Sequence, residues 1–113
     1  MSLIDAFLLD FVTVDFDNDS KLAEGILREF VANAEGNYSK DNFILDTPVT
    51  SAGWYFAKLF LSAQFVRSIY ELNTDRIINS KGKKFEEKFV TWLNTEFKHK
   101  KCGAHVKIAT EMK

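Results

Sequence analysis

The sequence of 113 residues contains a single cysteine, a single proline and only five glycines. One cysteine excludes a disulfide framework, and it also excludes a four-thiolate zinc site formed within the chain. A chain with 46% hydrophobic residues can bury a core, which excludes a disordered or low-complexity linker. At this length the sequence predicts a single compact domain, residues 1–113.

Long uninterrupted apolar runs are also missing. Asp5 and Asp10 break the apolar N-terminal segment, and no basic residue precedes it, so the sequence predicts no secretory signal. The most apolar stretch, residues 54–66, contains Lys58 and is too short to cross a bilayer core of about 30 Å. We therefore expect a cytoplasmic protein that does not bind membranes.

Two segments show clear helical spacing of their apolar residues. In residues 17–35 one face is apolar and the other charged, and Asp19 or Ser20 is expected to cap the first turn. Residues 83–98 have phenylalanine, tryptophan and leucine on one face and lysine and glutamate on the other. Both segments are predicted to be amphipathic helices that pack on a core.

A third, longer helix is predicted from Pro48 to about Leu72, with Thr47 as its cap and Asn73 at its end. Its apolar residues cover roughly twice the width of the stripe found on an ordinary surface helix. Two arrangements explain this excess. Either the helix lies at the centre with neighbours on several sides, or one of its faces binds another chain.

Short strands are predicted where apolar and polar residues alternate. The alternation covers residues 11–16 and 104–108, and the apolar run 42–46 fits a brief strand or an extended link. Residues 2–16 fit a helix, a strand, or one followed by the other. The C-terminal strand is expected to pair with residues 42–46 or 11–16. The predicted fold is mainly α, with a long central helix and a minor β element of two or three strands; a pure helical bundle is the alternative.

A calcium site is not predicted, although residues 15–19 copy the first five positions of an EF-hand loop. The sixth position is Ser20 instead of the glycine that permits the sharp turn. The twelfth is Ile26 instead of the glutamate that binds calcium through both oxygens. A helix start explains these acidic residues better.

Catalysis and metal binding find little support in the sequence. His99, Cys102 and His105 are spaced three residues apart, but this spacing is not a zinc signature and the chain has no further His or Cys. A local Cys–His pair without an orienting third residue is a weak sign of a nucleophile. We expect no enzyme activity, no metal and no cofactor.

The charges are distributed unevenly along the chain. Residues 1–50 carry ten acidic and three basic residues, whereas residues 51–113 carry six acidic and twelve basic ones. An acidic half can dock on a basic partner such as a toxin or nuclease. The excess of lysine over arginine suggests an AT-rich bacterial gene.

We therefore predict a non-catalytic interaction protein, a small inhibitor, immunity or adaptor factor that binds a partner protein. Its predicted contacts are acidic residues of the first half and apolar or aromatic anchors around a lysine. The predicted partner-binding residues are Asp15, Asp17, Asp19, Glu24, Glu35, Trp54, Lys58, Leu61 and Phe65.

Two alternatives involve other surfaces. A nucleic-acid-associated protein would use the lysine clusters at residues 81–84 and 98–101, which flank the last predicted helix. A homodimer would bury the surplus apolar face of the helix predicted over residues 48–72.

Overall fold

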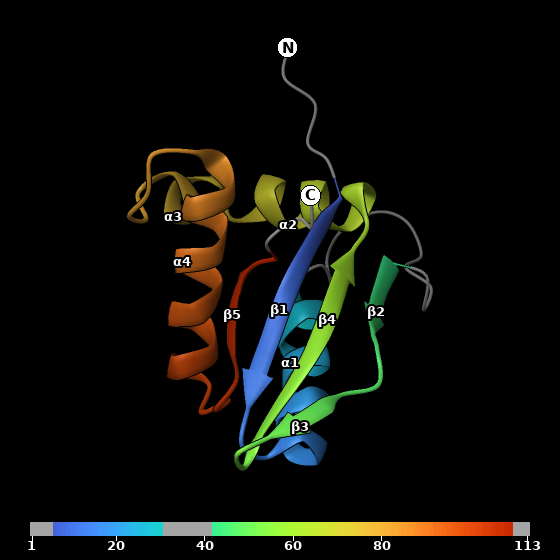
Figure 1. The fold of residues 1–113 in the computed structure, drawn as a ribbon. Coiled ribbons are helices and arrows are strands. Elements are labelled where there is room, and N and C mark those ends of the chain that lie inside the picture. The colour runs from blue at the N-terminus through green and yellow to red at the C-terminus, as the bar shows by residue number, and fades with distance from the viewer. Residues whose placement is uncertain (1–5, 31–41, 110–113) are drawn as a thin grey trace.

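The structure is a computed structural model that describes residues 6–30 and 42–109 (Figure 1). Of these residues, 49% are helical and 27% lie in strands. The elements in chain order are β1 (Phe7–Thr13), α1 (Phe16–Phe30), β2 (Phe43–Leu45), β3 (Val49–Ser51), β4 (Trp54–Leu61), α2 (Ala63–Leu72), α3 (Thr74–Ile78), α4 (Phe85–His99) and β5 (His105–Ile108). The fold is α+β with a five-stranded antiparallel sheet, so the predicted mainly α fold with a minor β element is wrong.

The sheet has the strand order β2-β4-β1-β5, and β3 pairs with β4 next to β2 (Figure 1). β1 is central: all its residues are in register with β4, and residues 9–12 also pair with β5. The C-terminal strand therefore pairs with the N-terminal segment, which is one of the two pairings predicted. β1 begins at Phe7 and ends at Thr13, so residues 7–13 of the ambiguous N-terminal segment are a strand.

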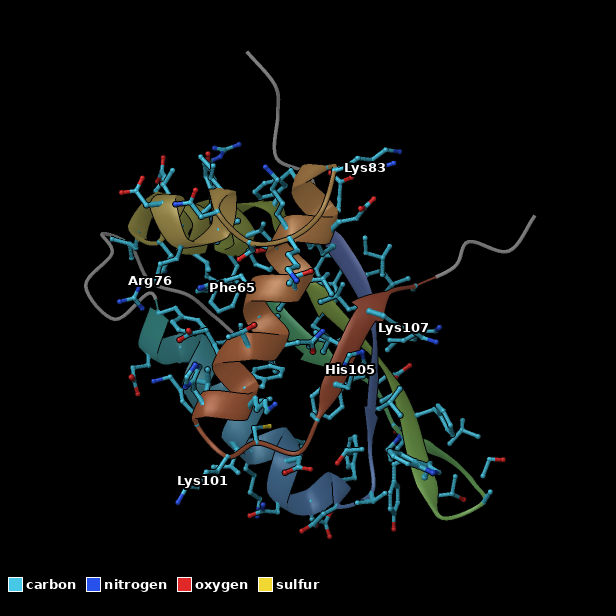
Figure 2. All side chains as sticks on the ribbon, turned by 90° about the vertical axis from the view of Figure 1, so that its left-hand side faces the viewer. Phe65, Arg76, Lys83, Lys101, His105 and Lys107 are labelled. Carbon is cyan, nitrogen blue, oxygen red and sulfur yellow. The ribbon has the colours of Figure 1, made fainter. Side chains whose placement is uncertain are left out.

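The four described helices lie on one side of the sheet, which gives two layers (Figure 2). The odd-numbered residues of β1 and β4 face these helices, and Leu9, Phe11 and Leu59 are fully buried. Phe65 of α2 and Phe89 of α4 pack in the same hydrophobic cluster. Among the described helices, none is both long and apolar enough to span a membrane.

The long helix predicted over residues 48–72 is not formed, because the segment folds into β3, β4 and α2. A turn at Ala52 and Gly53, with φ angles of 52° and 83°, reverses the chain between β3 and β4. Positive φ at both central residues is the geometry of a tight hairpin. Ser62 then begins a new element, since its side chain accepts a hydrogen bond from the backbone N–H of Phe65 at 3.2 Å and caps α2.

α1 and α4 confirm the two helices predicted from apolar spacing. Residues 31–35, predicted as the last part of the first helix, lie outside the described residues. The cap of α1 differs from the prediction: Oδ1 of Asp15 accepts a hydrogen bond from the backbone N–H of Asn18 at 3.4 Å, and Asp19 and Ser20 lie inside the helix.

Candidate interaction surface

The face of the sheet opposite the helices, hereafter the open face, is not covered by any described element (Figure 2). Successive side chains of a strand point to opposite faces, so the even-numbered residues of β1, β2 and β4 point outward. In β3 and β5 the outward residues are those paired with the outward residues of β4 and β1. The open face comprises Leu8, Asp10, Val12, Ile44, Val49, Ser51, Trp54, Phe56, Lys58, Phe60, His105 and Lys107.

Large apolar side chains are concentrated on the open face. Five of the ten that are exposed in the described residues lie there, and the others are dispersed over the helices, a loop and the end of β5. Their exposed fractions are 51% for Leu8, 46% for Ile44, 68% for Val49, 47% for Trp54 and 44% for Phe56. A half-exposed large side chain presents roughly 100 Å², so the five present roughly 500 Å² together. This is near the upper end of the 300–600 Å² that is typical for the largest apolar patch on a monomer.

The register arranges most of the open face into three rows that run across the strands, and the pair Ser51 and Trp54 lies beyond the third row. The first row is apolar and contains Ile44, Phe60 and Leu8. The second row is charged and contains Asp46, Lys58, Asp10 and Lys107. The third row contains Val49, Phe56, Val12 and His105.

The charged row alternates in sign across the sheet. Asp46, just after β2, accepts the backbone N–H of Lys58 at 2.7 Å through Oδ1. Nζ of Lys58 forms an ion pair with Oδ1 of Asp10 on the neighbouring strand. Lys107 lies opposite Asp10 on the other side. Because the Lys58 side chain is half exposed, this pair adds only about 0–1 kcal/mol to stability.

The structure describes eight of the nine predicted partner-binding residues and does not bring these eight together. Trp54 and Lys58 lie on the open face. Asp15, Asp17 and Glu24 lie at or in α1, in the helix layer. Asp19, Leu61 and Phe65 are buried and therefore not available to a partner, and Glu35 lies outside the described residues. The acidic and aromatic parts of the predicted surface thus belong to different layers.

Asp19 has a structural position instead. The residue is 4% exposed, and its carboxylate joins three segments. Oδ2 accepts a hydrogen bond from the hydroxyl of Thr13 in β1. Oδ1 accepts the backbone N–H of Gly103, in the link between α4 and β5, at 3.1 Å, and the side-chain amide of Asn18 at 3.4 Å. A buried charge is tolerated where it is hydrogen-bonded in this way.

Cys102 belongs to the same buried cluster. Its Sγ donates to the backbone carbonyl of Asp19 at 3.5 Å. Burial raises the pKa of the thiol, and the nearby Asp19 charge raises it further, although a backbone hydrogen bond from Ala104 lowers it. His99 and His105 are exposed. No group of three or more His, Cys, Asp or Glu residues in the described ranges is placed to hold a metal ion.

The two lysine clusters lie at opposite ends of α4 (Figure 2). Lys83 precedes the helix and Lys101 follows it. A 15-residue helix is about 22 Å long, so the clusters do not form one basic patch. Nζ of Lys100 also contacts Oε1 of Glu29 at 3.5 Å, which partly neutralises the second cluster.

A groove of about 620 Å³ lies between α1 and the segment from β2 to Pro48. Phe16 and Phe43 contribute apolar surface to it. Two of its charged residues, Glu24 and Arg28, form an ion pair with each other at 2.9 Å. The groove therefore offers fewer unpaired charges than its lining suggests.

Comparison of the chain with protein-family models, with curated proteins and with solved structures finds no significant match.

Most residues of the open face were not predicted from the sequence, including Leu8, Ile44, Val49 and Phe56. The available signal was Gly53, a residue typical of the tight turn that joins two strands of a hairpin. Once residues 54–61 are treated as a strand, the aromatic residues Trp54, Phe56 and Phe60 fall on its outward face.

Proposed function

We propose that this protein is a non-catalytic interaction protein that binds another protein through the open face. The clustering of five half-exposed apolar side chains on one uncovered sheet face carries the proposal. Burying roughly 500 Å² of apolar surface yields a gross hydrophobic free energy of roughly 12 kcal/mol. Only what remains after the cost of association, about 4–15 kcal/mol, contributes to affinity. The polar contacts and the further area of the face must supply the rest.

The composition of the open face favours a protein partner over a nucleic acid. Single strands are bound by aromatic platforms in positively charged grooves. Here Asp10 lies in the middle of the face and Asp46 at its edge, where both repel phosphates. Leu8, Ile44 and Val49 are aliphatic and offer no ring on which a base can stack. Apolar rows on either side of a charged row are better matched by a protein surface.

In-cell photo-crosslinking tests this proposal. A benzophenone amino acid replaces Phe56 on the open face or, as the matched control, exposed Arg67 on α2. We expect a protein adduct from position 56 and none from position 67. The adduct should disappear when Trp54→Glu is added, because a charge then lies beside the crosslinker.

Two results would contradict the proposal. One is the absence of any position-specific protein adduct at 56 while circular dichroism shows a native fold. The other is an adduct that nuclease treatment removes, which would identify a nucleic acid as the partner.

A further inference from the structure

We infer that the protein that covers the open face is a second copy of this chain, paired face to face about a two-fold axis parallel to the strands. The axis lies in the interface between the two sheets, above the gap between β1 and β4. This inference rests on the proposed function and names the partner of the same surface.

The charged row is complementary to itself about this axis. Its order is Asp46, Lys58, Asp10, Lys107, with signs that alternate across the sheet. A two-fold axis along the strands keeps each row in place and reverses its order on the second copy. Lys58 then faces Asp10 of the second copy, and Lys107 faces Asp46 of the second copy. Opposite charges meet at all four positions.

The other two-fold axis in the plane of the interface is disfavoured by the same charges. An axis perpendicular to the strands keeps the order along the row, so Lys58 would face Lys58 and Asp10 would face Asp10. Like charges placed opposite each other are destabilising, and such repulsion selects one pairing over another. Because paired charges contribute little net affinity when buried, the charged row sets orientation and the apolar rows supply the affinity.

The apolar rows also match about the strand-parallel axis. In the first row Phe60 faces Leu8 of the second copy, and in the third row Phe56 faces Val12 of the second copy. Each of these two aromatic rings thus meets an aliphatic side chain, which allows the two layers to interdigitate at the usual separation of about 10 Å. Both copies use the same surface in this pairing, as a closed two-fold dimer requires.

The area of the open face is sufficient for such a dimer. A standard stable interface buries about 800 Å² per partner. The five exposed apolar side chains supply roughly 500 Å² of this. The charged row and the half-buried Val12 and Phe60 lie between them on the same face and add to it.

Sedimentation velocity on the purified full chain tests the inference. Across a wide range of concentrations we expect a concentration-dependent species of twice the 13.0 kDa chain mass. Phe56→Glu should abolish it, because a carboxylate is then buried against Val12 of the second copy. Ile78→Glu, an equally large change at a residue of α3 that is 45% exposed, is the matched control and should leave the dimer intact.

Charge complementation tests the axis itself. Asp10→Lys alone and Lys58→Asp alone each place like charges opposite each other in the homodimer, so both variants should be monomeric. When the two variants are mixed, every position of the row again meets an opposite charge, and a heterodimer should form. Circular dichroism confirms the fold of each variant.

The outcomes separate this inference from the proposed function. A wild-type chain that stays monomeric at all concentrations overturns the inference, while a position-56 adduct with a different protein would leave the proposed function standing. A dimer that survives Phe56→Glu places the interface elsewhere and also overturns it. Failure of the two charge variants to pair on mixing excludes the strand-parallel axis.

Discussion

Removing the buried carboxylate of Asp19 should be among the most destabilising single changes in a polar residue of this protein. Asp19→Ala removes the acceptor of hydrogen bonds from the Thr13 hydroxyl and the Gly103 N–H. Hydrogen bonds to a charged group contribute about 1.5–3 kcal/mol each. A carboxylate in the first turn of a helix adds about 0.3–1 kcal/mol. We expect the free energy of unfolding to fall by about 4 kcal/mol, a large share of a typical total of about 5–15 kcal/mol.

Urea unfolding followed by circular dichroism measures this loss, with Asp17→Ala as the control. Asp17 lies in the same first turn of α1 but is exposed, so its replacement should cost about 0.5 kcal/mol. Thr13→Val combined with Asp19→Ala should cost less than the sum of the two single losses, because both remove the same hydrogen bond. If Asp19→Ala costs no more than Asp17→Ala, the carboxylate does not hold the three segments together.

Three further results are expected. Asn94→Ala should lower the free energy of unfolding by about 2 kcal/mol in urea titrations, because the Asn94 side chain donates a hydrogen bond to the backbone carbonyl of Val106 at 2.8 Å and accepts one from its N–H at 2.9 Å. A loss below about 0.5 kcal/mol, the cost of an ordinary surface substitution, would contradict this. Gly25→Ala should stabilise the protein by about 0.5–1 kcal/mol, because Gly25 is exposed inside α1 and no atom lies near the Cβ that alanine adds. Gly103→Ala should instead destabilise the protein, because its Cβ would lie 2.9 Å from Oδ2 of Asp19. The Cys102 thiol binds its proton more tightly in the folded protein, so the free energy of unfolding should fall as the pH rises above the ordinary thiol pKa of 9.0. Cys102→Ala should lack this part of the loss, and equal pH profiles of stability for the two proteins would contradict the raised pKa.

The amphipathic helices could be predicted because the necessary information is local. In α4 the exposed Glu86 and Glu87 and the buried Phe89 and Leu93 repeat with the helical period. β5 was also predictable, since Val106 is buried between exposed His105 and Lys107. Such patterns compare a polar side with an apolar side within a few residues.

β4 could not be recognised by the same test, because both of its sides are apolar. Leu59 and Leu61 face the core while Trp54 and Phe56 face outward, so polar residues do not mark the alternation. A helical wheel treats such a segment as apolar all round. Only the turn at Gly53 indicated a hairpin.

The candidate surface depends on pairings that the sequence does not reveal. Asp10 and Lys58 are 48 residues apart in sequence and become neighbours only through the β1–β4 register. Asp19 and Gly103 are 84 residues apart, and without that contact an aspartate in a first helical turn is expected to be exposed. The acidic segment was therefore assigned to a partner when one of its members is part of the core.

The central position of β1 affects how the chain folds during its synthesis. β1 is synthesised before both strands that flank it, β4 (residues 54–61) and β5 (residues 105–108). Until residue 108 has been synthesised, a nascent chain can pair β1 only with β4, and the other edge of β1 keeps unpaired N–H and C=O groups. Sheets built from such distant segments fold slowly, and exposed edges favour aggregation. Translation speed and chaperone access over the second half of the message should therefore affect the yield of folded protein more than changes in the first half.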